Sequence, residues 1–535
     1  MKSGILKNRY YLYLTEFFSG MAVMAVELGA SRLLAPYFSS SQIVWTIIIG
    51  TIMIAMALGN VFGGKWADKE SDPSKLFTRI MIASVWTALI PLFGKYVIVA
   101  ITGVMIVTVS TWLLVWAAFA ACMLIFVFPL FLLGTVTPSL IKYSVSDLGE
   151  SGRISGKLGA CNTIGSIIGT FIPTFVTIPA VGTAVTFLIF AGILFILSAI
   201  YFIAEKRGRA RSVISAVVLL LCCIFGHDPD FAFWEDGLTY EGESVYNYLQ
   251  VRDTQYATYL STNVMFGVQS VRMKNEGLTG MYYDYALAAP VMAGVYDDDE
   301  NADILILGMG TGTYATQLKK YMPHANITGV EIDDKITDLS HKYFALPESI
   351  PTVTYDGRAY LNSDDRKYDV IMVDAYQDIT IPFQMSSTEF FTLVKDHLKD
   401  DGVMVMNMNM HSDGNETDDI TLYLSETVSS VFDDTVTVDV SYTTNRELFA
   451  CMGGDLKQSL EDNMSEVTDP ELYGMLEVTN ANLKDGLKGD HIFTDDKAPV
   501  ELLGMRTIDT IIQGEVGQYK EVFKEKGLKG LIEAL

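Results

Sequence analysis

The chain has 535 residues, half of them hydrophobic, and a formal net charge of −25 at pH 7. A length of this order predicts roughly two to four domains. The charge is unevenly divided: residues 1–226 contain 16 Lys and Arg against 8 Asp and Glu, whereas the remainder contains 22 against 55. So acidic a second half repels nucleic acid, which excludes it as a partner, and attracts cations such as amines. Acidity that serves solubility alone is the alternative.

Cysteines give no sign of a cross-linked or metal-binding fold. Four of the five lie within residues 1–226, and no CxxC motif or Cys/His cluster occurs. The sequence therefore predicts neither a disulfide framework nor a zinc site, and we expect no metal. Basic residues precede the first apolar stretch, but Glu16 interrupts it and further apolar runs follow. This pattern predicts a first transmembrane helix rather than a cleaved signal peptide.

Apolar runs long enough to cross a bilayer crowd residues 1–226 and are absent afterwards. The predicted spans cover residues 11–34, 44–64, 77–98, 112–137, 158–179 and 184–204. A seventh run, 212–226, would reach only about 22 Å as a helix, so it is a short span or an interfacial or re-entrant segment. We therefore expect a transmembrane helical domain of six or seven spans, with the lipid bilayer as its partner.

Two features of this half point to function. The sequence GGKWADK, from Gly63, resembles the short cytoplasmic-loop motif of the major facilitator superfamily, although six helices are half of such a transporter. Glu27 and Arg32 are ionisable residues in or near the first span, which makes them a functional-site hypothesis. A structural pair at the membrane boundary is the alternative.

Beyond residue 240 the pattern changes to that of an α/β protein. SVYNYLQVRD, ATYLSTN and GVQSVRM read as short strands, and MYYDYALAAPVMAGVY has helical periodicity. The run ILIL in ADILILGMGTGTYATQLKKYM is continuously apolar, as a central parallel strand covered on both faces should be. The predicted domains are 1–226 (transmembrane), 240–300 (a small β-rich lead-in and helix), 301–505 (Rossmann-like) and 506–535 (a helical tail).

A glycine turn follows the ILIL strand. Gly308, Gly310 and Gly312 form GxGxG, which allows a tight turn and a close approach of ligand to backbone at a helix N-terminus. The next strand, ITGVEID, contains Glu331 about 20 residues further on, where an acid can accept hydrogen bonds from both ribose hydroxyls. A nicotinamide dehydrogenase shares these two features.

Two further motifs separate the alternatives. VTYDGRAYL places Asp356 and Gly357 after a third strand, and YDVIMVDAY is a fourth strand ending at Asp374. Ligands of open α/β sheets bind beyond the carboxyl ends of the strands, where all four motifs fall. The set in this order predicts a class I S-adenosylmethionine-dependent transferase.

These motifs, together with ESVYNYLQVRD and TDDKAPVELL, resemble the spermidine synthase family of aminopropyltransferases over roughly residues 243–503. The helices before them resemble those fused to membrane-bound members. The resemblance implies that the nucleoside is held by Gly308, Gly310, Gly312 and Glu331, and that Asp356 and Gly357 frame the adenine. It also implies that Asp374, the first Asp of the family's DSSD motif, helps to deprotonate the attacking amine.

The sequence departs from the family on the acceptor side. Thr311 replaces the Asp of the family's GGGDG turn, which holds the amine of the aminopropyl group, and a Gln that contacts the nucleoside corresponds to Asn247. Replacing that Asp removes a charge that would repel the carboxylate of S-adenosylmethionine, so either this donor or its decarboxylated form is expected. DSSD becomes DAYQ, and the Tyr-His-Glu run becomes Tyr-Asp-Tyr. The expected substrate-binding residues are Tyr283, Asp284, Tyr376, Gln377 and Asp378.

Three functions remain open. The first is a membrane-bound, spermidine synthase-like transferase that alkylates a small amine or polyamine and releases methylthioadenosine. The second uses the same pocket for methyl transfer or for acceptor-free cleavage of S-adenosylmethionine. The third is a nucleoside-binding sensor coupled to a half-transporter. A second copy of the chain, in a homo-oligomer, is a further candidate partner.

The side of the membrane on which the catalytic domain lies follows from the distribution of basic residues and from the number of spans. Basic residues cluster before the first span and after the second, fourth and sixth, all on one side, which predicts a cytoplasmic N-terminus. Six spans return the chain to the cytoplasm, where the donor is made, and we expect the catalytic domain there. A seventh crossing would leave it outside.

Overall fold

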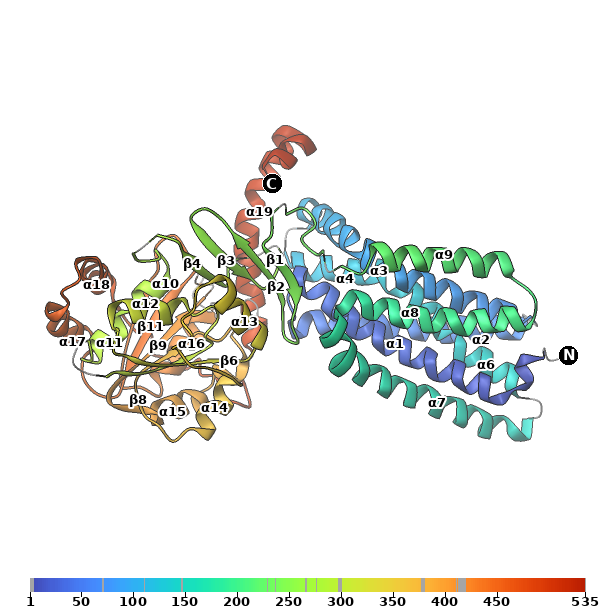
Figure 1. The fold of residues 1–535 in the computed structure, drawn as a ribbon, viewed down its shortest axis with the longest axis horizontal. Helices are drawn as coiled ribbons and strands as arrows, with labels where there is room; N and C mark the ends of the chain where they lie inside the picture. Colours follow the sequence, from blue (N-terminus) through green and yellow to red (C-terminus); the bar gives the residue numbers. More distant parts are fainter. Residues whose placement is uncertain are drawn as a thin grey trace. The chain divides into compact units, whose positions relative to one another are not determined.

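The computed structural model describes residues 4–69, 72–109, 111–145, 148–228, 230–235, 237–264, 267–275, 277–296, 301–376, 381–409, 411 and 420–534. The chain forms two compact units, Met1–Glu235 with Glu241–Tyr248, and Asp236–Tyr240 with Leu249–Leu535. The first unit is helical and apolar, and the second contains an α/β domain (Figure 1). The helical N-terminal region and the α/β fold predicted from the sequence are both confirmed.

The helices of the first unit lie alongside one another (Figure 1). The 3-10 helices are η1 (Ile5–Lys7) and η2 (Leu148–Glu150), and a π-helical turn is η3 (Pro173–Thr177). The α-helices are α1 (Arg9–Phe38), α2 (Gln42–Lys69), α3 (Ser74–Thr108), α4 (Leu113–Ile125), α5 (Val127–Gly134), α6 (Val136–Ser144), α7 (Ser151–Ile172), α8 (Ile178–Ala204) and α9 (Arg209–Phe225).

Within the described residues, five segments are long and apolar enough to cross a membrane: Arg9–Phe38, Gln42–Lys69, Ser74–Ile106, Val127–Ser144 and Ser151–Ala204. The last has 54 residues. As a single helix it would be about 80 Å long, which is enough for two crossings.

Gly182 divides this long segment. Its φ of 78° and ψ of 172° are not helical, so the helix stops and restarts there. The restarted helix is capped by Glu243, whose carboxylate accepts hydrogen bonds from Thr183 N at 2.9 Å and Thr183 Oγ1 at 2.6 Å. The division agrees with the two separate runs, 158–179 and 184–204, in the sequence.

The run 112–137, expected to be one span, is instead broken into α4, α5 and the start of α6. Pro129 lacks the N–H that would bond to the carbonyl of Ile125, so the helix cannot continue unchanged at that point. The indole Nε1 of Trp86 donates to the Ile125 carbonyl oxygen at 2.8 Å instead. The segment long and apolar enough to cross a membrane is therefore shifted, to Val127–Ser144.

Helix α9 covers the ambiguous run 212–226. It packs against α3 and α8 and runs in the same direction as α3. Near its start, Arg211 Nη1 donates to Thr78 Oγ1 at 3.0 Å, and a Cβ on Gly226, just past its end, would lie 3.4 Å from Leu92 Cβ. With 17 residues, α9 rises about 25 Å along the bundle.

Two sheets follow the helices in the sequence, a small one and a large one. The small sheet has the order β1 (Tyr240–Glu243), β2 (Tyr248–Asp253), β3 (Ala257–Ser261) and β4 (Ser270–Met273), with β3 antiparallel to both β2 and β4. The large sheet has the order β12-β10-β11-β9-β8-β5-β6-β7. Its strands are β5 (Asp303–Leu307), β6 (Asn326–Glu331), β7 (Thr352–Thr354), β8 (Tyr368–Val373), β9 (Leu398–Met408), β10 (Asp434–Asp439), β11 (Arg446–Cys451) and β12 (Lys484–Asp485).

The large sheet is mixed. Strands β5 to β9 pair in parallel, and β11 runs antiparallel to both β9 and β10. The carboxyl ends of the parallel strands therefore lie at one edge. The α-helices around it are α10 (Tyr282–Ala286), α11 (Ala288–Met292), α12 (Thr313–Tyr321), α13 (Asp334–Tyr343), α14 (Gly357–Ser363), α15 (Thr388–Asp396), α16 (Ile420–Ser429), α17 (Leu456–Asn463), α18 (Pro470–Asn482) and α19 (Val500–Ala534), with 3-10 helices η4 (Phe383–Met385) and η5 (Met464–Glu466).

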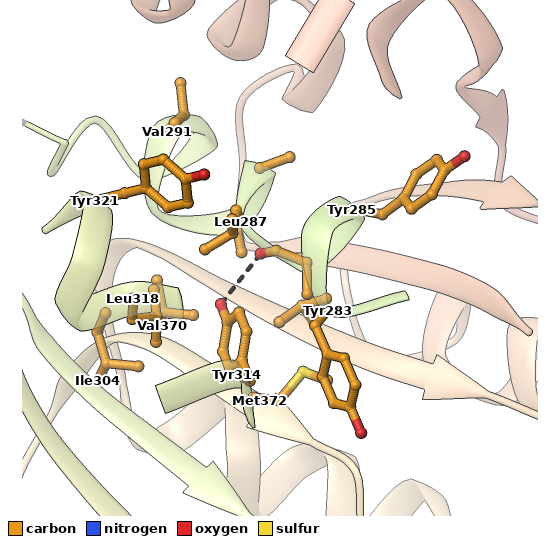
Figure 2. Packing of buried hydrophobic residues seen from close by; sticks show 14 of the residues in the cluster. Tyr283, Tyr285, Leu287, Val291, Ile304, Tyr314, Leu318, Tyr321, Val370 and Met372 are labelled. Carbon is orange, nitrogen blue, oxygen red and sulfur yellow. Dashed lines mark hydrogen bonds between the residues drawn. The ribbon is translucent and has the colours of Figure 1, made fainter. Parts of the chain in front are cut away.

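Strand β5 shows why the sheet is buried on both faces. Ile304 and Ile306 pack in one apolar cluster, and Leu305 and Leu307 pack in another. Figure 2 shows part of the first cluster, where Tyr314 OH of α12 donates a hydrogen bond to the Ala286 carbonyl oxygen at 3.1 Å.

The predicted boundary between the Rossmann-like domain and the helical tail, between residues 505 and 506, falls inside α19.

Helices α1 and α7 approach each other through glycines, which gives a test of the packing. A Cβ on Gly165 would lie 1.9 Å from Phe17 O, whereas a Cβ on Gly159, on the same helix, meets nothing within 4 Å. We expect Gly165→Val to destabilise the helical unit by about 1–3 kcal/mol, the usual cost of overpacking. Thermal unfolding in detergent should show the loss for Gly165→Val and little change for Gly159→Val; equal melting temperatures would contradict the packing.

Candidate active site

The turn after β5 lies directly against the loop after β8. Gly308 has a φ of 86°, and a Cβ there would lie 2.4 Å from Asp374 O and 2.6 Å from Ala375 Cα. Asp374 N donates to Leu307 O at 2.9 Å, which extends the pairing of the two strands past their ends. Only glycine fits this position, since both the conformation and the contact exclude a side chain.

Glu331 is tied to the same turn. Its Oε2 accepts from Gly310 N at 2.9 Å, and its Oε1 accepts from Asp333 N at 3.1 Å. The side chain is buried, and burial raises the pKa of the Glu331 carboxyl to about 7 although these backbone donors act in the opposite direction. Each oxygen keeps a second lone pair, which suits an acceptor of two neighbouring hydroxyls.

Asp356 and Gly357 open α14. Asp356 is the N-cap of this helix, and its side chain accepts from Ala359 N at 2.8 Å. A Cβ on Gly357 would lie 3.3 Å from Met385 Cε and 3.6 Å from Leu307 Cβ. The pair therefore lies beside the end of β5, and the N-cap bond accounts for one of the Asp356 oxygens.

Asp374 is held by two polar side chains. Tyr282 OH donates to its Oδ2 at 2.6 Å, and Asn407 Nδ2 donates to its Oδ1 at 2.9 Å. The side chain keeps some accessible surface, but protein atoms crowd it, and this burial raises the pKa of the carboxyl to about 7. An acid with such a pKa can both accept and release a proton near neutral pH.

A chain of hydroxyls lies next to the glycine turn. Thr311 Oγ1 is 2.6 Å from Ser270 Oγ, which is in turn 3.2 Å from Tyr283 OH. All three residues are buried, and the Tyr282 and Tyr283 rings lie 4.0 Å apart between centroids. Burial, followed by the charge of Asp374, raises the pKa of Tyr283. Thr311 therefore sits in a neutral, hydroxyl-lined environment.

Two other expected site residues, Asp284 and Tyr376, form hydrogen bonds with backbone groups of the protein. The carboxylate of Asp284 accepts from Thr279 N at 2.9 Å and from Gly280 N at 2.6 Å, so it braces the loop before α10. Tyr376 OH donates to Asn407 O at 2.5 Å and accepts from Asn409 N at 2.9 Å. Their expected contacts with substrate remain predictions.

The structure does not test the roles expected of three further residues. Asn247 belongs to the first unit, where its N–H donates to Ser244 Oγ at 2.8 Å. Gln377 and Asp378 lie outside the described residues. Within the described part of the chain, no group of three or more His, Cys, Asp or Glu side chains is arranged to hold a metal ion.

Comparison with known proteins identifies the family. The family model of the spermine/spermidine synthase domain matches residues 290–452. A probable polyamine aminopropyl transferase of Bifidobacterium longum (strain NCC 2705) is 54% identical over 354 residues, which are 63% of this chain and 78% of that protein. The chain belongs to the polyamine aminopropyltransferase family. It is thus a member of a family of transferases.

More distant members are also similar. A polyamine aminopropyltransferase of Vibrio vulnificus (strain CMCP6) is 27% identical over 201 residues, which are 36% of this chain and 67% of that protein. The spermidine synthase of Thermotoga maritima, whose crystal structure is known, is 19% identical in sequence to this chain. The two structures align with a TM-score of 0.37 over 46% of this chain and 83% of that one.

Sequence reasoning missed three residues beside Asp374. Tyr282 and Asn407 bond to Asp374, and Glu447 lies close enough for its pKa to be raised by the Asp374 charge in addition to burial. The signals were faint: Asn407 falls in the alternating run MVMNMNM, and Glu447 interrupts the apolar strand RELFAC. Such polar residues at buried strand positions point to a site only when the register of the strands is known.

Proposed function

We propose that the protein is a membrane-bound aminopropyltransferase that moves the aminopropyl group of an adenosyl sulfonium donor to an amine or polyamine. The observation that supports it best is the backbone contact of Gly308 with Asp374, which brings the nucleoside turn and a candidate proton acceptor together. Family membership supports this reaction over methyl transfer, acceptor-free cleavage and sensing without turnover.

The reaction needs little covalent chemistry from the protein. A neutral amine attacks the carbon next to the sulfonium, the N–C bond forms as the C–S bond breaks, and the electron pair leaves with the neutral thioether methylthioadenosine. The amine gives up a proton, which the Asp374 carboxylate accepts directly or through water. Tyr282 and Asn407 orient this carboxylate by donating one hydrogen bond to each oxygen.

Thr311 influences which form of the donor the site can bind. Its hydroxyl bonds to Ser270, within the neutral cluster, so the described residues offer no carboxylate at the position where the family has its Asp. A neutral side chain tolerates the carboxylate of intact S-adenosylmethionine as well as the decarboxylated form. Mass spectrometry of products, with each donor and a panel of amines, distinguishes aminopropyl from aminocarboxypropyl transfer.

The helical unit has the surface of a membrane domain. Large apolar side chains on the outer faces of its helices are exposed, among them Met53, Ile203 and Val213. In water such surface would be costly, whereas in lipid it is at no disadvantage. Along α1, Arg9 and Arg32 are about 35 Å apart, slightly more than the thickness of the hydrocarbon core.

The number of membrane crossings determines whether the N-terminus and the α/β unit lie on the same side of the membrane. We propose that α9 is a seventh crossing, because it runs along α3 from Thr78 to Leu92. The basic clusters favour a cytoplasmic N-terminus, and an odd number of crossings then puts the α/β unit outside. The cytoplasmic placement expected from six spans and donor supply is the alternative.

The donor-side prediction concerns Glu331. Because ribose hydroxyls donate to a carboxylate, and burial raises the Glu331 pKa to about 7, nucleoside affinity should rise as pH rises from 6 to 8. Glu331→Ala should weaken methylthioadenosine binding by more than about tenfold and remove this pH dependence, since ligand hydroxyls lose their partner. Calorimetry provides the measurement, with exposed Asp338→Ala as control. Unchanged affinity in Glu331→Ala would refute the assignment.

The acceptor-side prediction concerns Asp374. A base must be ionised to accept a proton, so kcat/KM should rise with pH through about 7 and level off above it. Asp374→Asn should keep methylthioadenosine affinity and lower turnover by about 10²–10⁴. The exposed Asp365→Asn is the control. If affinity and turnover fall together, Asp374 orders the following loop instead, and wild-type turnover would remove it from the mechanism.

The topology prediction uses right-side-out cells. Protease added outside should digest the α/β unit and spare a tag placed at the N-terminus, because seven crossings put the two on opposite sides. An odd number of crossings is disproved if both are spared or both are digested. Digestion of the tag alone would keep seven crossings and reverse their direction, against the distribution of basic residues.

A further inference from the structure

A carboxyl group lies inside the helical unit. Glu16 of α1 has no exposed surface, and α1 is one of the segments long and apolar enough to cross a membrane. Along the helix Glu16 lies about 10 Å from Arg9, and therefore within the proposed hydrocarbon core. An ionisable residue at this depth is costly to keep, because its charged form must leave water, and such residues mark functional sites.

Two neighbouring helices hold one oxygen of this carboxyl. Thr137 Oγ1 of α6 donates to Glu16 Oε1, and Asn162 Nδ2 of α7 donates to the same atom at 3.0 Å. Helices α1 and α7 touch at this point, since a Cβ on Gly20 would lie 2.6 Å from Asn162 O. Both α6 and α7 lie beside α1 (Figure 1). Glu16 therefore joins three helices at a close crossing.

The other oxygen of Glu16 indicates which protonation state the site holds. Oε2 is buried and has no hydrogen-bond partner among the described residues. A protonated carboxyl fits this asymmetry, because its carbonyl oxygen accepts two bonds and its hydroxyl is a donor. A carboxylate would leave a charged oxygen unpaired in an apolar interior. Ser19 Oγ, also buried and unbonded in the described part of the chain, lies one turn further along the same face of α1 and offers an acceptor for that hydroxyl.

The surroundings of Glu16 supply no compensating cation. Helices α2 to α8 all pack against α1. Among their described residues, the titratable side chain that interacts with Glu16 is Cys161 of α7, whose thiol carries no positive charge. In the same part of the chain, no Lys or Arg forms a hydrogen bond or ion pair with Glu16. A proton is therefore the positive charge that neutralises this carboxyl.

A proton can reach Glu16 without a cavity. Thr137 and Asn162 are half-buried, so the junction has an exposed side. The Thr137 oxygen can take up a proton from that side while its own O–H passes a proton to the Glu16 carboxylate, which leaves both side chains neutral. A half-turn of the carboxyl then carries the new O–H to the oxygen that has no partner. No larger ion has to enter the bundle.

We propose that Glu16 is a proton-binding site of the helical unit, which holds a proton while α1, α6 and α7 are packed together and releases it when their junction opens. The inference rests on the membrane placement in the proposed function and does not depend on the transferase reaction. The junction has two states, closed with a neutral Glu16 and open with an ionised one. Because opening releases a proton, raising the pH favours the open state.

Infrared spectroscopy of the full-length protein in lipid nanodiscs tests for the bound proton. At pH 7 the wild type should show the C=O stretch of protonated carboxylic acid, and Glu16→Gln should lose the intensity of one such group. The matched control is Glu150→Gln, because Glu150 is ionised beside Arg153, at 2.5 Å, and should contribute nothing to this band. A band of equal intensity in the wild type and in Glu16→Gln would overturn the proposal.

Melting temperatures of the same variants test the release of the proton. Glutamine keeps the carbonyl acceptor and replaces the O–H by an N–H donor, so Glu16→Gln should fold and imitate the protonated form. From pH 6 to pH 8 the wild type should lose stability relative to Glu16→Gln, since only the wild type releases this proton on unfolding. A difference that is independent of pH would contradict the proposal. Recovery of the wild type in the aqueous phase of a detergent phase separation would refute the membrane placement, and the infrared band decides the proton site in either case.

Discussion

The close approach of the β5 turn to the backbone after β8 is the constraint on which the site depends. Gly308 is pressed against Asp374 O and Ala375 Cα, with no room for a side chain. The residues that would hold a nucleoside and the acid that would receive a proton are therefore positioned by one rigid contact between neighbouring strands. Because the contact is made by backbone atoms, side-chain changes on the acceptor side leave it intact. This explains how the chain can keep the glycine turn of the family while Thr311 and Gln377 differ from the family pattern.

Much of this arrangement could be predicted from the sequence because parallel strands have a simple signature. ILIL is apolar on both faces, so its two sets of side chains pack in two different clusters, and the polar residues Glu331 and Asp374 come at or just past strand ends. Topology then brings them to one edge of the sheet. The fold class and the relation of Gly308, Glu331 and Asp374 follow from these local rules.

Other features depend on contacts between distant segments, which local patterns do not contain. Glu447 and Asn407 become neighbours only through the antiparallel register of β9 and β11. Asp284 is an expected substrate ligand, and the structure adds bonds to its carboxylate from the backbone N–H groups of Thr279 and Gly280. The break within 112–137 depends on which partner takes the Ile125 carbonyl, and that partner is Trp86, on another helix. In each case the residue type could be read from the sequence, whereas the residue that it contacts could not.

The side of the membrane on which the α/β unit lies and the supply of its charged donor depend on each other. A sulfonium nucleoside with a charged amine crosses a hydrocarbon core only at high cost, because each charge must leave water. If the α/β unit and the source of the donor share a side, the helical unit needs only to anchor the enzyme. If α9 completes a seventh crossing and the α/β unit lies outside, the donor must reach it by another route. The basic clusters and α9 favour the second arrangement, in which donor supply becomes part of what the membrane has to provide.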